Sequence, residues 1–238
     1  AIIMAIPTFK SLTYETELAD GTSVKYRPYV VKEERQLLIA LENGDEVIIG
    51  RAIQAIIDAC TFGKLNVGKL PVYDIEHIFI KMRSKSVGEK IKFNAKCSKC
   101  EGQNEHEIDL DHVSTGTINP NNNPRIMISE DMGMQLRPPS YNMVLEAAGS
   151  GMTAVESLYE TIISCVDKIF DGDEIFECNK EPREEVAAFV ESLPYEYFNK
   201  IKEYIETLPK ISYTMEYDCT SCNEHNNTKL EGLSNFFT

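Results

Sequence analysis

The chain has 238 residues, of which 42% are apolar and 26% charged, enough to form a hydrophobic core in one large domain or two small ones. Its 38 acidic residues outnumber the 24 basic ones, and the formal net charge is −14. This balance disfavours nucleic acids and anionic membrane surfaces as partners, since Lys and Arg supply most of the affinity for both. No apolar run approaches the roughly 20 residues that span a bilayer, so we expect no membrane segment.

The first expected element is a β-hairpin. Residues 11–18 and 22–31 both alternate in polarity, and Asp20-Gly21 between them is typical of a tight primed turn. Pro28 should mark the end or the edge of the second strand, because proline cannot donate to a ladder.

Three helices should follow the hairpin, because apolar residues recur at spacings of three and four. Asn43-Gly44 is expected to close the first helix, and Pro71 fits the first turn of the third. The helical segments are residues 32–41, 45–62 and 70–89. Together with the hairpin they predict an N-terminal α+β domain over residues 1–96.

A polar loop over 116–125 and a hairpin over 125–140 begin the next region. An amphipathic helix over 153–170 follows, with Thr153 and Glu156 placed to form a capping box. Two further helices, over 181–193 and 194–208, each open with Pro and acidic residues nearby. We therefore predict a mainly helical domain over residues 113–210.

Two short motifs, "KCSKC" and "DCTSC", lie on either side of that domain. Each follows an alternating strand and precedes polar turn residues, a pattern typical of a zinc knuckle. Four thiolates complete a structural Zn²⁺ site, and the two motifs supply four. The predicted metal ligands are Cys97, Cys100, Cys219 and Cys222. Residues 97–112 and 211–238 would then form a split zinc-ribbon-like module that encloses residues 113–210 as an insertion, and the chain as a whole would belong to the α+β class.

Other interpretations of these cysteines stay open. A redox CxxC pair would sit at a helix N-terminus, and neither motif precedes a helical pattern. Disulfides and metal-free thiols are further alternatives. His106 and His225 lie near the motifs and could replace a ligand, although exposed turn histidines are the simpler interpretation.

Catalytic motifs are lacking: the sequence has no GxSxG, HExxH or phosphate-binding loop. The small-residue segment 149–153 lacks the Lys of such a loop. Asp74 and Glu76 should point to different faces of a helix and stabilise its first turn. We predict no enzymatic activity.

Several short sequence motifs of the N-terminal half occur in the same order in one known family. The chain resembles the small baseplate-hub proteins of T-even-type contractile-tailed phages (myoviruses), most densely over residues 5–140. The final segment "LEGLSNFF" is also similar. The matching positions are Arg27, Pro28, Lys32, Glu33, Glu34, Leu70, Pro71, Tyr73, Asp74, Glu76, Arg83, Ser84, Ser86, Gly88 and Glu89.

The resemblance implies a virion tail protein, or a factor that helps build the baseplate hub, made in the host cytoplasm and contacting other baseplate, hub and tail proteins. Zinc is not implied by it and depends on the cysteine spacing. Apolar segments near the two ends (1–9 and 233–237) and the helix at 194–204 are candidate docking surfaces. The alternative hypothesis is a zinc-ribbon module that binds nucleic acid, which the acidic balance opposes.

Overall fold

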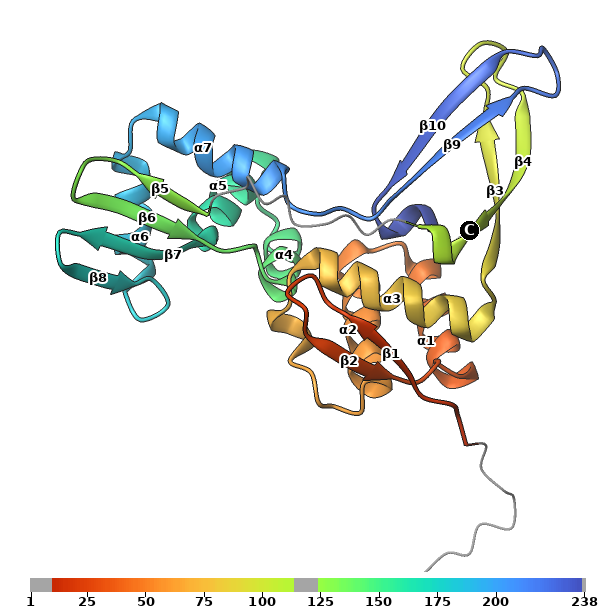
Figure 1. Ribbon diagram of the computed structural model, residues 1–238, viewed down its shortest axis with the longest axis horizontal. Helices are drawn as coiled ribbons and strands as arrows, with labels where there is room; N and C mark the ends of the chain where they lie inside the picture. The colour runs from red at the N-terminus through yellow and green to blue at the C-terminus, as the bar shows by residue number, and fades with distance from the viewer. Residues whose placement is uncertain (1–9, 114–123, 237–238) are drawn as a thin grey trace, which may run out of the picture.

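The computed structural model describes residues 10–113 and 124–236. Figure 1 shows three parts: a helical body, an arm of two long hairpins, and a distal lobe. The polar loop expected at 116–125 falls almost entirely outside the described residues, as does the apolar segment 1–9. The described helices and small antiparallel sheets agree with the predicted α+β class.

The body contains β1 (Tyr14–Glu17), β2 (Ser23–Tyr26), α1 (Val31–Asn43), α2 (Glu46–Cys60), η1 (Val67–Lys69), α3 (Val72–Val87) and α4 (Tyr141–Gly149). The arm contains β3 (Lys90–Lys96), β4 (Gln103–Asp109), β9 (Ser212–Asp218) and β10 (His225–Glu231), with the turns η2 (Leu110–His112) and η3 (Leu233–Phe236) at its base. The distal lobe contains β5 (Arg125–Met127), β6 (Met132–Leu136), α5 (Ala154–Cys165), β7 (Val166–Asp171), β8 (Glu174–Glu177), α6 (Arg183–Ser192) and α7 (Tyr195–Glu206).

The β1–β2 hairpin forms at the expected place, but its turn differs from the predicted one. The N–H of Leu18 donates to Thr22 O and the N–H of Gly21 donates to Leu18 O, both at 2.9 Å. Gly21 has φ +84°. This geometry is the three-residue loop whose last residue is left-handed, and it differs from the tight primed turn that Asp20-Gly21 suggested.

Helix boundaries in the body follow local capping chemistry. Gly44 ends α1 in the left-handed conformation, φ 76°, and its N–H bonds to Ala40 O. The Asp45 side chain then caps α2 by accepting from the N–H groups of Val47 and Ile48. The two helices are therefore separated by a short connection, as predicted from Asn43-Gly44.

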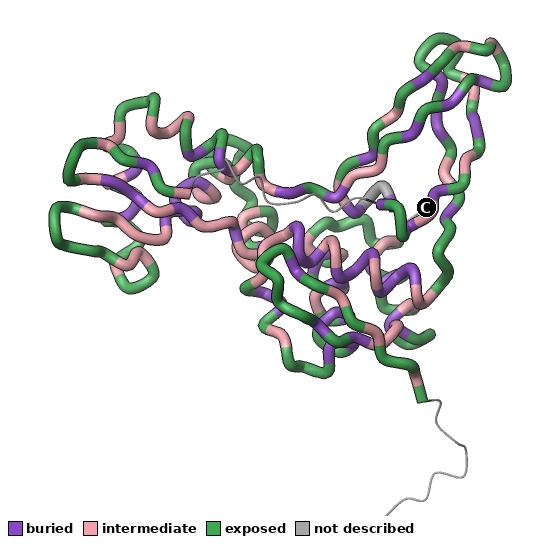
Figure 2. Tube along the Cα trace, in the orientation of Figure 1, coloured by how far each residue is buried: buried purple, intermediate pink, exposed green. Residues whose placement is uncertain are grey.

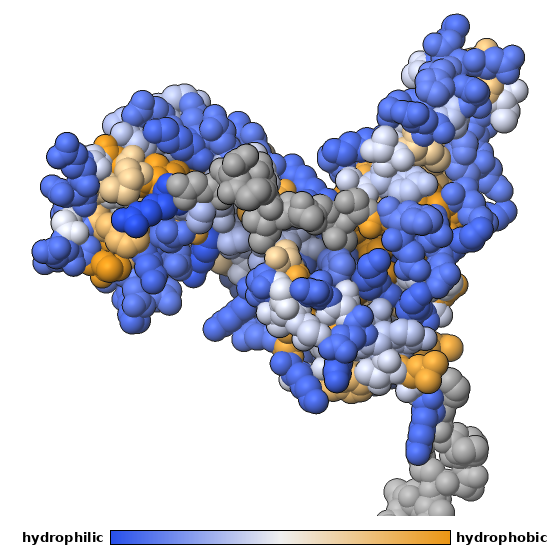
Figure 3. All heavy atoms as spheres, in the orientation of Figure 1, coloured by the Kyte–Doolittle hydropathy of each residue, from blue (hydrophilic) through white to orange (hydrophobic). Residues whose placement is uncertain are grey.

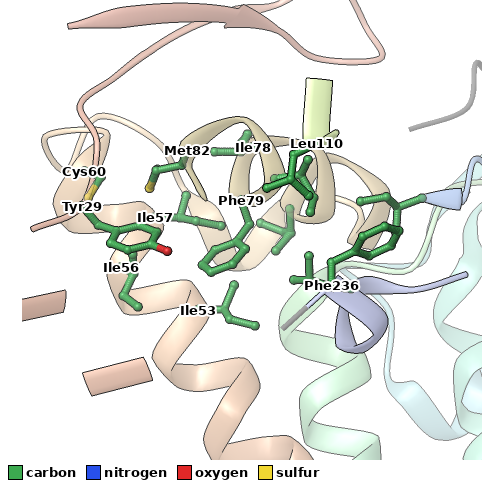
Figure 4. Packing of buried hydrophobic residues seen from close by; sticks show 14 of the residues in the cluster. Tyr29, Ile53, Ile56, Ile57, Cys60, Ile78, Phe79, Met82, Leu110 and Phe236 are labelled. Carbon is green, nitrogen blue, oxygen red and sulfur yellow. The ribbon is translucent and has the colours of Figure 1, made fainter. Parts of the chain in front are cut away.

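The core of the body lies between α2 and α3 and extends to the base of the arm. Figure 4 shows side chains of these two helices packed together with Leu110 and Phe236. α4 also joins this core through Tyr141, whose hydroxyl donates to Gly50 O at 3.2 Å, and through Leu145. Hence α4, although within the predicted insertion, packs on the body.

The distal lobe has its own core, built from an antiparallel sheet in the order β5-β6-β7-β8 and from α5, α6 and α7. The hairpin expected over 125–140 is present as β5–β6. The helix expected over 153–170 begins with the predicted capping box but ends at Cys165. Residues 166–171 form β7 instead, because pairing with β6 and β8 outweighs a local pattern that suits either structure. The domain limits at 96/97, 112/113 and 210/211 stay a prediction.

Candidate metal centre

The two CxxC motifs occupy the turns at the tip of the arm, one between β3 and β4 and the other between β9 and β10 (Figure 1). In the first turn Cys97 and Gly102 close the hairpin, with the Cys97 N–H donating to Gly102 O at 3.0 Å. The Glu101 N–H donates to Cys97 O at 3.0 Å, and Glu101 has φ 60°, in the left-handed region. Each CxxC therefore lies in a hairpin turn, a different setting from the helix N-terminus of a redox pair.

The second turn repeats this geometry. The Cys219 N–H donates to Glu224 O and the Asn223 N–H donates to Cys219 O, both at 2.8 Å. Asn223 has φ 55°, which places it in the same left-handed region as Glu101. The two turns therefore have the same hydrogen bonds and a left-handed residue at the same position, in agreement with the duplicated motif.

The structure brings all four predicted ligands together. Their Sγ atoms all lie within 4.8 Å of one another. Two of these separations join opposite hairpins: Cys97 Sγ to Cys222 Sγ is 3.7 Å and Cys100 Sγ to Cys219 Sγ is 3.6 Å. A tetrahedral zinc centre with Zn–S bonds of about 2.3 Å places its sulfurs about 3.8 Å apart. The donor set and its spacing therefore fit Zn²⁺ or a similar thiophilic ion.

Backbone donors favour the thiolate form of two of these thiols. The Ser221 N–H lies 3.4 Å from the Cys219 Sγ and lowers the pKa of Cys219 to about 6. The N–H groups of Cys100 and Lys99 likewise lower the pKa of Cys97. A cation in the cluster would favour the thiolate form of all four groups.

The fourth thiol is affected in the opposite direction. The Glu224 N–H lowers the pKa of Cys222, but the thiols of Cys100, Cys219 and Cys97 outweigh it and raise that pKa to about 12. Crowded thiols cannot all ionise without a compensating charge, so metal binding should release protons.

Family comparison gives the chain an identity. A family model described as T4 bacteriophage base plate protein matches residues 11–238. The chain belongs to this family. Comparison of the baseplate protein with curated proteins and with solved structures found no match. Among the described residues of this baseplate protein, no helix has both the length and the apolar character needed to cross a bilayer.

Two asparagine side chains that the sequence did not reveal as functional also contact the four-sulfur cluster. Asn104 on β4 and Asn226 on β10 are both buried at the tip of the arm. The Asn104 Nδ2 lies 3.6 Å from the Cys219 Sγ, and the Asn226 Nδ2 lies 3.5 Å from the Cys97 Sγ. Their occurrence at matching positions after the two CxxC motifs was the only feature of the sequence that could have revealed them.

The two histidines near the motifs stand apart from the four-sulfur cluster. His106 on β4 packs its ring against Tyr217, with 4.4 Å between the ring centroids. His225 is exposed, and its Nδ1 lies 2.8 Å from an Asp218 oxygen; this contact raises the pKa of His225. Both side chains have structural contacts elsewhere on the hairpins.

Asp74 and Glu76, expected to serve the first turn of α3, instead join distant segments. Asp74 is buried and accepts the Ala19 N–H at 3.0 Å, next to the β1–β2 turn. Glu76 accepts the N–H groups of Ile211 and Leu233 at 3.4 and 3.3 Å. Burial raises the pKa of both carboxyl groups despite these bonds. The two residues therefore connect α3 to the hairpins on either side of it.

Proposed function

We propose that this phage baseplate protein is a structural subunit or assembly factor of the baseplate hub, that it acts through contacts with other baseplate, hub and tail proteins, and that it carries a structural Zn²⁺. The family places the protein in the virion tail as a baseplate component. The observation that carries the metal assignment is the convergence of four sulfurs at the tip of the arm. Assignment of the protein to the baseplate hub is favoured by the sequence motifs around Arg27-Pro28 and Leu70-Pro71.

A structural metal agrees with the proposed absence of enzymatic activity. Four thiolates fill a tetrahedral ion and leave no position for a water or substrate. The ion would join residues that lie far apart in sequence, since Cys97 and Cys222 stand on different hairpins. Its contribution would therefore be to the folding of the arm, because such a site cannot form in the unfolded chain.

The body and the distal lobe both have exposed apolar side chains that are available for contacts with other proteins. Val31, Leu38 and Ile39 are exposed on α1, and Tyr195 at the start of α7 is 73% exposed. Figure 3 shows that hydrophilic residues cover most of the visible arm, whereas apolar residues gather on the lobe. The remainder of α7 turns Ile201 and Tyr204 into the lobe core, so only part of this candidate docking helix is free to bind.

The nucleic-acid hypothesis is weakened by how the lysines near the motifs are paired. Lys96 lies 3.1 Å from Glu101, Lys99 lies 2.7 Å from Glu224, and Lys229 lies 2.5 Å from Glu231. Cations already neutralised by carboxylates offer little to a phosphate backbone. Tight DNA binding with a steep salt dependence would favour this alternative over the structural role.

Mass spectrometry of purified phage particles tests the proposed role. A hub subunit should be present at a fixed stoichiometry, whereas an assembly factor should appear in infected-cell extracts, in the host cytoplasm, bound to hub proteins but absent from finished particles. Recovery with neither particles nor hub intermediates would contradict the proposal. Metal analysis of the purified protein should give one zinc per chain.

A further inference from the structure

The two halves of the arm are held together by a reciprocal arrangement of side chains. Figure 2 shows buried positions alternating with exposed ones along the arm up to its tip. At the tip the buried positions include the first cysteine of each motif and one asparagine from each hairpin. These residues are Cys97, Asn104, Cys219 and Asn226, each at most 5% exposed.

Asn104 reaches from the first hairpin into the second. Its Oδ1 accepts the N–H of Thr220 at 2.9 Å and the hydroxyl of the same residue at 3.0 Å. Its Nδ2 donates to Gly102 O at 3.0 Å and lies 3.6 Å from the Cys219 Sγ. One amide therefore fixes its own turn, the opposite turn and the opposite buried sulfur.

Asn226 makes the same contacts in the other direction. Its Oδ1 accepts the N–H of Ser98 at 3.0 Å and the Ser98 hydroxyl at 2.9 Å. Its Nδ2 donates to Glu224 O at 2.8 Å and lies 3.5 Å from the Cys97 Sγ. The two asparagines and the two turns are thus related by an approximate two-fold exchange of partners.

We propose that Asn104 and Asn226 are positioning residues of the metal centre, each holding the buried thiolate of the opposite knuckle toward the ion. This inference rests on the proposed zinc site and deepens it. An N–H donor at a ligating sulfur fixes the direction of its lone pairs and reduces the negative charge that four thiolates bring to a divalent ion. Since each donor comes from the other hairpin, neither CxxC motif alone has a complete site.

Replacing Asn by Asp distinguishes the proposed positioning of a thiolate from a role limited to joining the two hairpins. In Asn104→Asp and Asn226→Asp, one carboxylate oxygen can still accept from Thr220 or Ser98. The other oxygen replaces the Nδ2 donor and faces the thiolate as a like charge. The substitution therefore keeps the link to the opposite turn and replaces the Nδ2 atom, which faces the opposite sulfur and also donates to Gly102 O or Glu224 O in its own turn.

Each variant has a matched control one position away. Gln103 and Asn227 are exposed, so Gln103→Glu and Asn227→Asp add the same charge to the same hairpins. Neither asparagine belongs to the body core, so the variants should keep the folded body. Protection of body amides from hydrogen exchange verifies this before metal is added.

The test is titration of the metal-free chain with Co²⁺, followed by the sulfur-to-cobalt charge-transfer bands and by competition with Zn²⁺. Wild type and both controls should bind one ion with the spectrum of four thiolates. Each Asn→Asp variant should bind about 10- to 100-fold more weakly. Its charge-transfer band should move to lower energy, because a sulfur without its N–H donor gives up electrons more easily.

The outcomes distinguish the two levels of the hypothesis. Wild-type affinity and an unshifted band in both Asn→Asp variants would overturn the positioning role and leave the four-cysteine centre intact. Absence of thiolate bands in the wild type would overturn the zinc assignment together with this inference. Weaker binding in the variants but not in the controls supports both.

Discussion

Substitution of Glu76 by Ala tests how the arm is attached to the body. The Glu76 carboxylate accepts the N–H of Ile211, directly before β9, and the N–H of Leu233, shortly after β10. A single side chain of α3 therefore holds both ends of the second hairpin. The Ala variant removes both acceptors while leaving the helix itself undisturbed, since Ala has the highest helix propensity.

The expected loss of stability follows from these contacts. A buried N–H left without a partner costs about 1 to 3 kcal/mol. Both bonds are long, at 3.4 and 3.3 Å, which favours the lower end of that range. Burial raises the pKa of Glu76, so the variant also loses an unfavourable desolvation of the carboxylate. We expect a net loss of about 1 to 2 kcal/mol, or roughly 3 to 6 °C in Tm.

Thermal unfolding and amide hydrogen exchange measure this effect globally and locally. Exchange should accelerate at Ile211 and Leu233, whereas the matched variant Glu42→Ala, at an exposed position of α1, should change neither quantity. Glu76→Gln should fall between the two, because its amide keeps one acceptor and turns an NH₂ group toward the other donor. Unchanged exchange at both amides in the Ala variant would refute the attachment.

Three further outcomes are expected. Removal of the proposed metal by a chelator should speed amide hydrogen exchange at the tip of the arm. The body should stay protected, since the body core contains none of the four cysteine ligands. Simultaneous unfolding of the arm and the body would contradict this prediction. Burial lowers the pKa of His77 below the 6.5 of the unfolded chain, so the unfolded state takes up its proton first and stability should fall as the pH drops from 7 to 5. His77→Gln should flatten that slope in urea titrations, and an unaltered slope would count against it. Gly50→Ala places a methyl group against the Leu145 Cδ2, closer than van der Waals contact allows, and should cost about 1 to 3 kcal/mol in the same assay. A loss below about 0.5 kcal/mol would show that the Leu145 side chain moves aside at little cost.

Features encoded by neighbouring residues could be predicted from the sequence. Gly44 and the Thr153–Glu156 box mark helix ends through contacts within a few residues. The CxxC spacing is also local, because each pair of thiols is presented by a single turn. The metal prediction required only the further assumption that two matching turns meet.

Features that depend on distant partners could not be predicted in this way. Residues 166–171 carry an apolar spacing that continues α5, and only pairing with β6 and β8 makes them a strand. Glu76 looks like a first-turn carboxylate until Ile211 is placed beside it. Asn104 and Asn226 resemble ordinary polar turn residues, because their main partners stand on the opposite hairpin.

The packing of the arm explains why its tip needs polar links. Each of its four strands has seven residues. The apolar cluster between the hairpins is small: it buries Ala95, Met215 and Tyr217, with Phe93 and Tyr213 partly buried against them. Strand pairing holds each hairpin but does not join one hairpin to the other. Beyond the apolar cluster and the Lys99–Glu224 ion pair, that junction depends on the asparagine pair and the four cysteines at the tip. We therefore expect the order of the arm to follow binding of the proposed metal.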